Sequence, residues 1–446
     1  MTAPELLARQ ALAGTTPAAG EAIEIYISTA TKRRYEMTAG QLENIESRQT
    51  FGAAVRVLTG GRLGFAYRAD ARPEALTAAI AEARDLAQRT AEDPARELPP
   101  RRDPARVNVP ASKDLQALPL EQKLELVRRL ETAALAADPR VRVAHQAAYQ
   151  EEDIHVALVS TLGVDMTWSF QEFGLSVAAV AEDDGDSQIG EDYRVWRLWD
   201  DLDPETVGRE AGEKAAHLLK AAPLPTARRS LLIPPAIGTG LFEMALSAWS
   251  AESVQRGRSY LAGREGQAIA AAAVTLLDDG TAPGGVATAP VDDEGTPTQR
   301  TELIRNGHLA GFMHNQETAR RAQVASTGNA YRASLQTPPS VGPTNVICLP
   351  GTFTESQLLA RAEGGLYLAE VLGLHTLDPV TGAFSLGASG WLIENGTLGR
   401  PVRGVTMAGQ LETLLKQVEA LGDQLTTYGR FSAPALLVRD IMVAGM

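Results

Sequence analysis

The chain has 446 residues, enough for two or three domains of roughly 100 to 200 residues each and for a sizeable core. Its 55 acidic and 42 basic residues give a net charge of −13, which repels phosphate backbones and argues against direct nucleic-acid binding. The single cysteine excludes an internal disulfide, and neither a secretory signal nor an apolar run of about 18 residues is visible, so we expect a cytoplasmic protein without a membrane span.

The first 95 residues predict an N-terminal α+β unit. An amphipathic helix pattern opens the chain, alternating residues at 21–37 indicate a strand, and 51–68 indicates a hairpin. Gly60 and Gly61 lie at the centre of this hairpin, where tight turns need positive φ values. Helical spacing of apolar residues then predicts a helix over 72–91.

A segment without periodicity separates this unit from the next. Residues 96–118 are rich in proline and charged residues, which is typical of a linker or of an arm laid over a surface. Residues 119–222 predict a middle α+β unit, with helices at 120–137 and 204–220 and long strands between them.

The pattern changes in residues 226–446, which predict a β-rich, barrel-like C-terminal domain. Helices are expected only at 236–249 and 355–362, among many short strands divided by Gly and Pro, and the sequence at 394–396 predicts a hairpin turn. The expected fold class is therefore α+β, with N-terminal mixed α/β units followed by a barrel-like domain.

Elementary catalytic motifs are missing from the sequence. None of the six histidines precedes a glutamate, and no nucleophile elbow or phosphate-binding loop occurs. His308 and His314 are expected at surface or hydrogen-bonded positions, and Cys348 as a small buried hydrophobe. Three acidic clusters could hold a hard cation, although Asp-capped turns explain such clusters more simply; they lie at 182–186, 277–280 and 292–295.

Three consecutive stretches resemble the signature region of the TldD/TldE family, also called PmbA or modulator of DNA gyrase: residues 289–321, 326–332 and 343–351. The hairpin at 51–68 and the closing strands resemble the same family in the same order. The resemblance implies two kinds of subunit. TldD carries a His-Glu-x-x-x-His helix and a later cysteine that form a metallopeptidase site, whereas TldE shares the fold without that motif.

Aligned with that helix, this sequence has Pro234 and Pro235 in place of the first histidine and the glutamate, and Thr239 in place of the second histidine. No cysteine occurs around 428–434, where the resemblance places the third ligand. The chain thus resembles TldE. The resemblance implies a non-catalytic subunit without a metal or other cofactor, paired with a zinc-bearing TldD-type subunit in a heterodimeric protease that trims unfolded peptides. A homodimer is the alternative assembly in the absence of that partner.

Two loop motifs are candidates for shaping a peptide groove, or else for simple turn chemistry, in which the glycines supply positive φ and Asp292 and Asn329 act as caps. Their residues are Asp292, Asp293, Glu294, Gly295, Thr327, Gly328, Asn329 and Arg332. Two other functions stay open. One is a self-sufficient hydrolase whose ligands come from the acidic clusters with His308 or His314, and the other is a non-enzymatic regulator linked to DNA gyrase through protein contacts.

Overall fold

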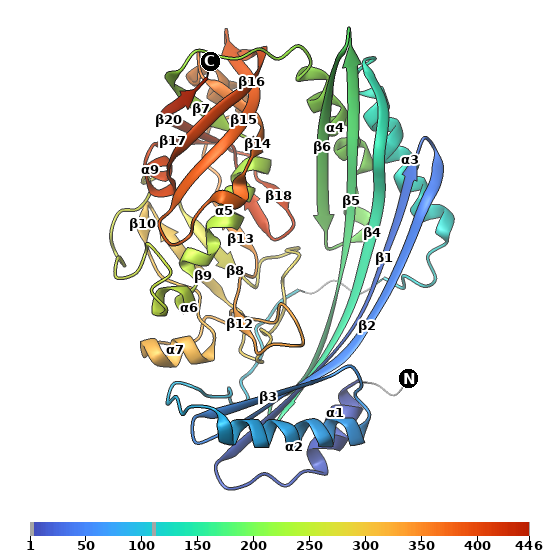
Figure 1. The fold of residues 1–446 in the computed structure, drawn as a ribbon, viewed down its shortest axis with the longest axis vertical. Helices are drawn as coiled ribbons and strands as arrows, with labels where there is room; N and C mark the ends of the chain where they lie inside the picture. Colours follow the sequence, from blue (N-terminus) through green and yellow to red (C-terminus); the bar gives the residue numbers. More distant parts are fainter. Residues whose placement is uncertain (1–3, 109–112, 446) are drawn as a thin grey trace.

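A long antiparallel sheet forms one side of the molecule (Figure 1). The computed structural model describes residues 4–108 and 113–445, and the sheet has the strand order β3-β2-β1-β4-β5-β6. Its strands are β1 (Glu21–Thr38), β2 (Gln41–Thr59), β3 (Arg62–Arg68), β4 (Val141–Ser160), β5 (Asp165–Asp183) and β6 (Asp186–Trp196). Because β1 pairs with β4 along most of its length, the N-terminal and middle units contribute to the same sheet.

Two pairs of helices cover opposite ends of this sheet, as Figure 1 shows. Helices α1 (Pro4–Ala13) and α2 (Pro73–Arg89) pack at one end, and α3 (Leu120–Ala136) and α4 (Pro204–His217) at the other. Each pair has its own apolar core with the strands beneath it. The helices predicted at 72–91 and 120–137 are confirmed to within two residues at each end, and the helix predicted to reach residue 220 ends at His217.

The hairpin predicted at 51–68 is present, but the predicted start of its first strand is wrong, because the strand begins earlier in the chain. Strand β2 starts at Gln41, directly after a turn in which Ala39 and Gly40 have φ values of 50° and 72°. Residues 41–50 are exposed and pair with β1, so they carry no alternation of apolar and polar side chains. Only the second half of β2 is buried, continuously from Gly52 to Val57, and its run of mostly apolar residues is the part from which a strand can be predicted.

The predicted barrel in the C-terminal domain is confirmed. Strands β16-β15-β14-β7-β20 are neighbours in that order, and pairing of β16 with β20 closes them into a five-stranded ring. They are β7 (Ala227–Ile233), β14 (Leu366–Leu372), β15 (Ala383–Glu394), β16 (Thr397–Gln410) and β20 (Leu436–Ala444), with β17 (Val418–Leu421) beside β20. The predicted turn at 394–396 joins β15 to β16, with Asn395 and Gly396 at positive φ.

A second sheet of short strands lies beside the barrel in the order β10-β9-β8-β13-β19-β18. Its strands are β8 (Leu276–Asp279), β9 (Arg300–Arg305), β10 (His308–Leu309), β13 (Val346–Cys348), β18 (Thr426–Tyr428) and β19 (Phe431–Ala433), and the separate pair is β11 (Ala330–Tyr331) and β12 (Ser340–Val341). The helices of this domain are α5 (Pro235–Ala245), α6 (Ala251–Gln255), α7 (Gln316–Ala322), α8 (Glu355–Arg361) and α9 (Leu411–Lys416). The helix predicted over 236–249 ends at Ala245, and a 3-10 turn continues it to Trp249.

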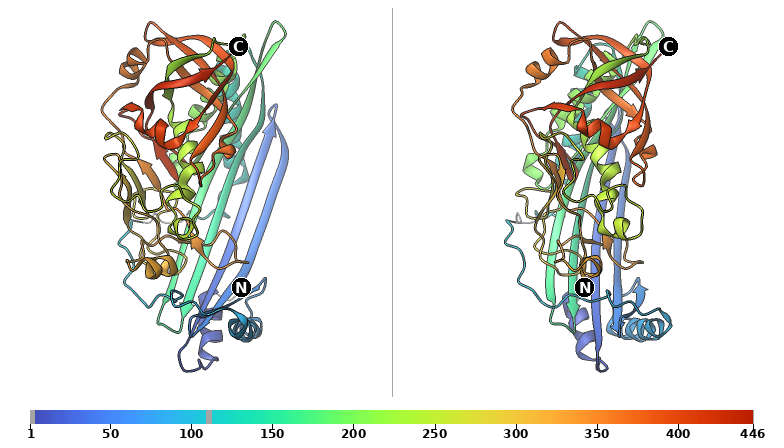
Figure 2. Two further views of the ribbon diagram at one scale, coloured as in Figure 1. Left: turned by 60° about the vertical axis from the view of Figure 1, so that its left-hand side comes forward. Right: turned by 90° about the vertical axis from the view of Figure 1, so that its left-hand side faces the viewer.

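The segment between the two N-terminal units runs along the C-terminal domain. Asp93 and Glu97 form ion pairs with Arg321 and Arg320 of α7, and the Ala105 amide donates to the Pro290 carbonyl at 2.9 Å. Figure 2 shows the long sheet and the C-terminal domain side by side. In the described part of the chain, no helix combines the length and the apolar character needed to cross a membrane.

Candidate functional site

Helix α5 begins directly after strand β7, with only Pro234 between them. Pro234 is the N-cap residue and Pro235 is the first helical residue, a position where proline is tolerated because the amide hydrogen would lack an intrahelical acceptor. Both prolines line a cavity of about 510 Å³ between α4, β6 and the C-terminal domain. Neither side chain offers a ligand atom or a base.

Thr239 lies one turn further along the same helix and is 2% exposed. Its Oγ1 donates to the Ala236 carbonyl at 3.0 Å, so the hydroxyl is committed to the backbone of its own helix. At Gly238 a Cβ atom would lie 2.8 Å from Leu436 Cδ1, which shows how closely α5 approaches the strands at the end of the chain. Helix α5 also contacts β18 and β19.

The structure thus places residues 234–239 beside residues 426–433, the two segments that carry a metal site in TldD-type subunits according to the resemblance. The residues present do not fit a zinc ion. Zinc needs imidazole, thiolate or carboxylate ligands, and here the segments offer Pro234, Pro235, Thr239, Tyr428 and Ser432. Within residues 4–108 and 113–445, no three His, Cys, Asp or Glu side chains are grouped so that they could hold a metal.

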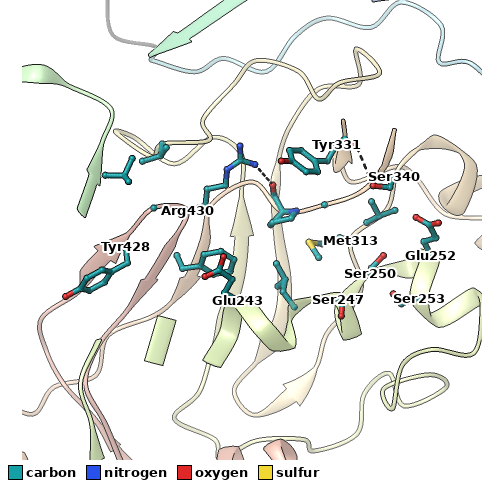
Figure 3. Close-up of a pocket in the computed structure, with 18 of the residues that line it drawn as sticks. Glu243, Ser247, Ser250, Glu252, Ser253, Met313, Tyr331, Ser340, Tyr428 and Arg430 are labelled. Carbon is teal, nitrogen blue, oxygen red and sulfur yellow. Dashed lines mark hydrogen bonds between the residues drawn. The ribbon is translucent and has the colours of Figure 1, made fainter. Parts of the chain in front are cut away.

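A groove of about 760 Å³ runs past the far end of α5 (Figure 3). Glu243 and Ser247 line it from α5 and the 3-10 turn, and Glu252 and Ser253 line it from α6. Tyr193 of β6 and Tyr428 of β18 meet edge to face, with their ring centroids 5.8 Å apart. Both tyrosines belong to outermost strands of their sheets, so the groove lies between two sheet edges.

The two loop motifs form one hydrogen-bonded structure. Asp292 accepts the backbone amides of Glu294 (3.0 Å) and Thr296 (2.9 Å) with Oδ1 and that of Ala330 (2.9 Å) with Oδ2. Gly295 and Gly328 have φ values of 80° and 71°. The predicted turn roles of Asp292 and both glycines are therefore confirmed, and the Ala330 contact shows that Asp292 also ties the two loops together.

Asn329 is the polar centre of the second loop. Its Nδ2 donates to Asp278 Oδ2 at 2.6 Å and to the Gly342 carbonyl at 3.0 Å, and its Oδ1 accepts from Thr327 Oγ1 at 2.6 Å. Asp278 also accepts the backbone amide and the hydroxyl of Thr344. Burial raises the pKa of Asp278 to about 6, while the hydrogen bonds from Asn329 and Thr344 oppose that rise.

A buried chain of charges joins these loops to the long sheet. Arg56 Nη1 lies 2.7 Å from Glu294 Oε1, Arg56 Nη2 lies 2.6 Å from Glu24 Oε2, and Arg332 Nη2 lies 2.6 Å from Glu24 Oε1. Asp293 accepts the Tyr26 hydroxyl at 2.9 Å. Burial acts to lower the pKa of Arg56, but Glu24 and Glu294 together raise it, so Arg56 is charged.

Sequence analysis identified the loop residues of this network but missed its partners on the sheet. The sequence did contain a signal for these partners, because Glu24 lies between Ile23 and Ile25, and Arg56 lies between two valines, in stretches that are otherwise mostly apolar. A charged residue inside a buried strand needs a partner of opposite charge. The pattern cannot say which loop supplies that partner, because Glu294 and Arg332 are more than 200 residues away along the chain.

The remaining predicted residues have structural roles. Asp183 pairs with Lys220 at 2.6 Å beside the β5–β6 turn, so the cluster at 182–186 is turn chemistry, as expected. Cys348 is 0% exposed and burial raises the pKa of its thiol to about 12, which confirms a buried packing role. His308 is exposed, with Nδ1 3.0 Å from the Asn306 carbonyl.

The prediction for His314 is wrong. It is buried, and its Nδ1 has no hydrogen-bond partner within the described residues. Burial also lowers the pKa of the ring. The backbone of His314 holds the second loop in place: its amide donates to Thr327 Oγ1 at 2.6 Å, and its carbonyl accepts from the same hydroxyl at 3.1 Å.

Three successive family models match this sequence: PmbA/TldA metallopeptidase domain 1 over residues 23–87, the central domain over 113–219 and the C-terminal domain over 226–445. The fold, with its long sheet and closed barrel, is accordingly that of a metallopeptidase-family protein. The chain belongs to the PmbA/TldD/TldE metallopeptidase family.

Its relatives cover almost the entire chain. The metalloprotease PmbA of Escherichia coli O157:H7 is 26% identical over 436 residues, which are 95% of this chain and 92% of that protein. A crystal structure from Thermotoga maritima, described as a modulator of a DNA gyrase, is 26% identical with a TM-score of 0.87 over 99% of both chains. TldE from Thermococcus kodakarensis shares the fold, with a TM-score of 0.88 and 21% identity over 99% of this chain and 100% of that one.

Proposed function

We propose that this chain is the metal-free subunit of a two-subunit metallopeptidase, in which a TldD-type partner carries the zinc and the pair degrades unfolded peptides. One observation carries the proposal: the helix expected to hold two ligands and the base has Pro234, Pro235 and Thr239 at those positions, and the only hydroxyl among them bonds to the Ala236 carbonyl. In this proposal the catalytic metal comes from the partner subunit.

The groove supports a role in holding the substrate. Serine hydroxyls and glutamates line one wall and Tyr193 and Tyr428 another, which gives polar partners for a peptide backbone and apolar surface for side chains. Outermost sheet strands border the groove at β6 and β18, and such strands can pair with an extended peptide. The geometry therefore favours an extended peptide as the ligand.

The buried network supports a second role, as a rigid frame. Glu24 and Arg56 on the sheet and Glu294 and Arg332 on the loops fix the distance between the sheet and the C-terminal domain, and the groove lies between those two parts. Pre-organised walls lower the entropy lost when a flexible peptide binds. The subunit would therefore contribute substrate binding while the partner contributes the chemistry.

The test is to purify the chain alone, a TldD-type protein from the same organism alone, and the two together, and to assay cleavage of an unstructured peptide. We expect cleavage by the mixture, zinc bound at one equivalent per partner chain, and no cleavage by this chain alone. A mixture made with a partner whose first motif histidine is replaced by alanine is the control. Cleavage by this chain alone with stoichiometric bound zinc would establish the self-sufficient hydrolase instead.

A further inference from the structure

A second cavity of about 360 Å³ opens beside the groove and lies between the long sheet and the two loops. Trp168 and Phe170 of β5 line it from the sheet, and Asp293 and Arg332 line it from the loops. It shares lining residues with the groove, among them Glu172, Tyr331 and Arg430. A chain lying in the groove can therefore extend its end into this cavity.

Arg197, directly after β6, is the most deeply buried free cation of this cavity. It is 7% exposed, its guanidinium lies 5.4 Å from the centroid of Phe170, and its Nη1 donates to the Val286 carbonyl at 3.2 Å. No carboxylate of the described residues lies within 4.0 Å of it. Burial lowers the pKa of Arg197 to about 10, so it is charged at neutral pH and has hydrogen-bonding capacity to spare.

Arg430 is a second cation on the same walls. Its guanidinium lies over the Tyr331 ring at 5.2 Å, and its Nη1 lies 3.5 Å from the Pro343 carbonyl, the contact dashed in Figure 3. It too has no ion-pair partner among residues 4–108 and 113–445. Two guanidiniums that form no ion pair among the described residues thus line one small cavity, where a buried charge without a close partner is costly.

In the described part of the chain, none of the acidic residues of the cavity forms an ion pair with Arg197 or Arg430. Asp292 is used by backbone amides, and Asp293 accepts the Tyr26 hydroxyl and the Arg332 amide. Glu152 lies 3.9 Å from Lys32. Glu172 also lines the cavity: burial and Glu152 raise the pKa of its carboxyl, whereas Arg430, Lys32 and Arg197 lower it.

We propose that this cavity binds the C-terminal carboxylate of a peptide, with Arg197 and Arg430 as the hydrogen-bond donors. Arginine is suited to this ligand because its planar fork matches a carboxylate. The half-buried rings of Trp168 and Phe170 receive the last side chain. The inference rests on the proposed function in one respect, that the groove holds peptides, and it adds that this chain selects substrates with a free C-terminal end.

The experiment measures binding of short peptides to the purified full-length chain by calorimetry. An N-acetylated hexapeptide of glycine, serine and a final leucine is compared as the free acid and as the C-terminal amide, so the two ligands differ only at the carboxylate. We expect the amide to bind about 10- to 100-fold more weakly, the range for loss of a charge-assisted hydrogen bond. Equal binding of both peptides, or no binding of either at millimolar concentration, would overturn the proposal.

Matched variants locate the effect. Arg197→Met should remove the preference for the free acid, while Arg102→Met, the same change at an exposed arginine that lines neither the groove nor the cavity, should retain it. Glu172→Gln should strengthen binding of the free acid several-fold, which keeps the proposal testable if Arg197→Met does not fold. An Arg102→Met variant that loses the preference equally, or a Glu172→Gln variant that weakens it, contradicts the assignment.

Two further comparisons separate this inference from others. Inorganic phosphate binding more tightly than the free-acid peptide would indicate a general anion site and would overturn the peptide assignment. Cleavage by the mixture with a TldD-type partner tests the proposed function separately. Cleavage without any acid preference in binding refutes only the carboxylate site, and an acid preference without cleavage refutes only the subunit role.

Discussion

Arg56→Met tests whether the buried charge network holds the sheet to the C-terminal domain. The side chains of Arg56, Glu24 and Glu294 are 5%, 2% and 3% exposed, so the ion pairs are shielded from solvent. After the substitution Glu24 keeps Arg332 at 2.6 Å, but Glu294 loses its cation and keeps only the Gln316 amide. Removing one partner of a buried ion pair costs about 3–5 kcal/mol, which is the expected loss in the free energy of unfolding.

The assay is urea denaturation at neutral pH, with Arg62→Met as the matched control. Arg62 lies on the same sheet, but its pair with Glu92 is 3.7 Å long and exposed, so its loss should cost about 1 kcal/mol or less. Combining Arg56→Met with Glu294→Gln should recover part of the loss, because the amide carries no buried charge. The reasoning is refuted if Arg56→Met costs no more than Arg62→Met, or if the double variant is no more stable than Arg56→Met.

Three more predictions follow from single positions. Burial raises the pKa of Asp192 to about 6, so the folded chain loses stability as the pH rises from about 4 to about 6. Asp192→Asn should therefore stabilise the chain at pH 8 by up to about 3 kcal/mol and lose that gain below about pH 4, and an equal gain at both pH values would contradict this. Gly328→Ala should be about 1–3 kcal/mol more destabilising in urea than Gly257→Ala, because both have positive φ but only at Gly328 does a Cβ lie 2.4 Å from the Pro297 carbonyl oxygen. Treatment with EDTA should leave the Tm of the isolated chain unchanged while abolishing cleavage by the mixture, and a drop of several degrees in the isolated chain would indicate a metal of its own.

Much of the local structure was predictable from sequence. Periodic apolar residues gave α2 and α3 nearly to the residue, the Gly60–Gly61 pair gave one hairpin turn, and the Asn395–Gly396 pair gave another. The exposed half of β2 was not predictable, because residues 41–50 have solvent on both faces and are held in place by pairing with β1. A local pattern of apolar residues indicates which side chains are buried, so a strand whose side chains are exposed has no such pattern.

The candidate site was predictable in its residue types and only partly in its arrangement. The sequence identified Pro234, Pro235 and Thr239 as unable to hold a metal, because that conclusion depends on side-chain chemistry alone. It also identified the loops around Asp292 and Asn329. It did not identify Arg197 as a candidate, because an isolated arginine after a strand has no distinguishing pattern.

The sequence by itself determined which side chains stand at positions 234, 235 and 239, the positions of most helices, and the glycines and aspartates that its loops require. Tertiary structure decided that the N-terminal and middle units share one sheet, that Glu24 and Arg56 meet Glu294 and Arg332, and that two unpaired arginines face one cavity. The physical reason is the distance along the sequence over which each interaction acts. Propensities and caps act over a few neighbouring residues, whereas burial and ion pairing depend on segments that only the folded chain brings together.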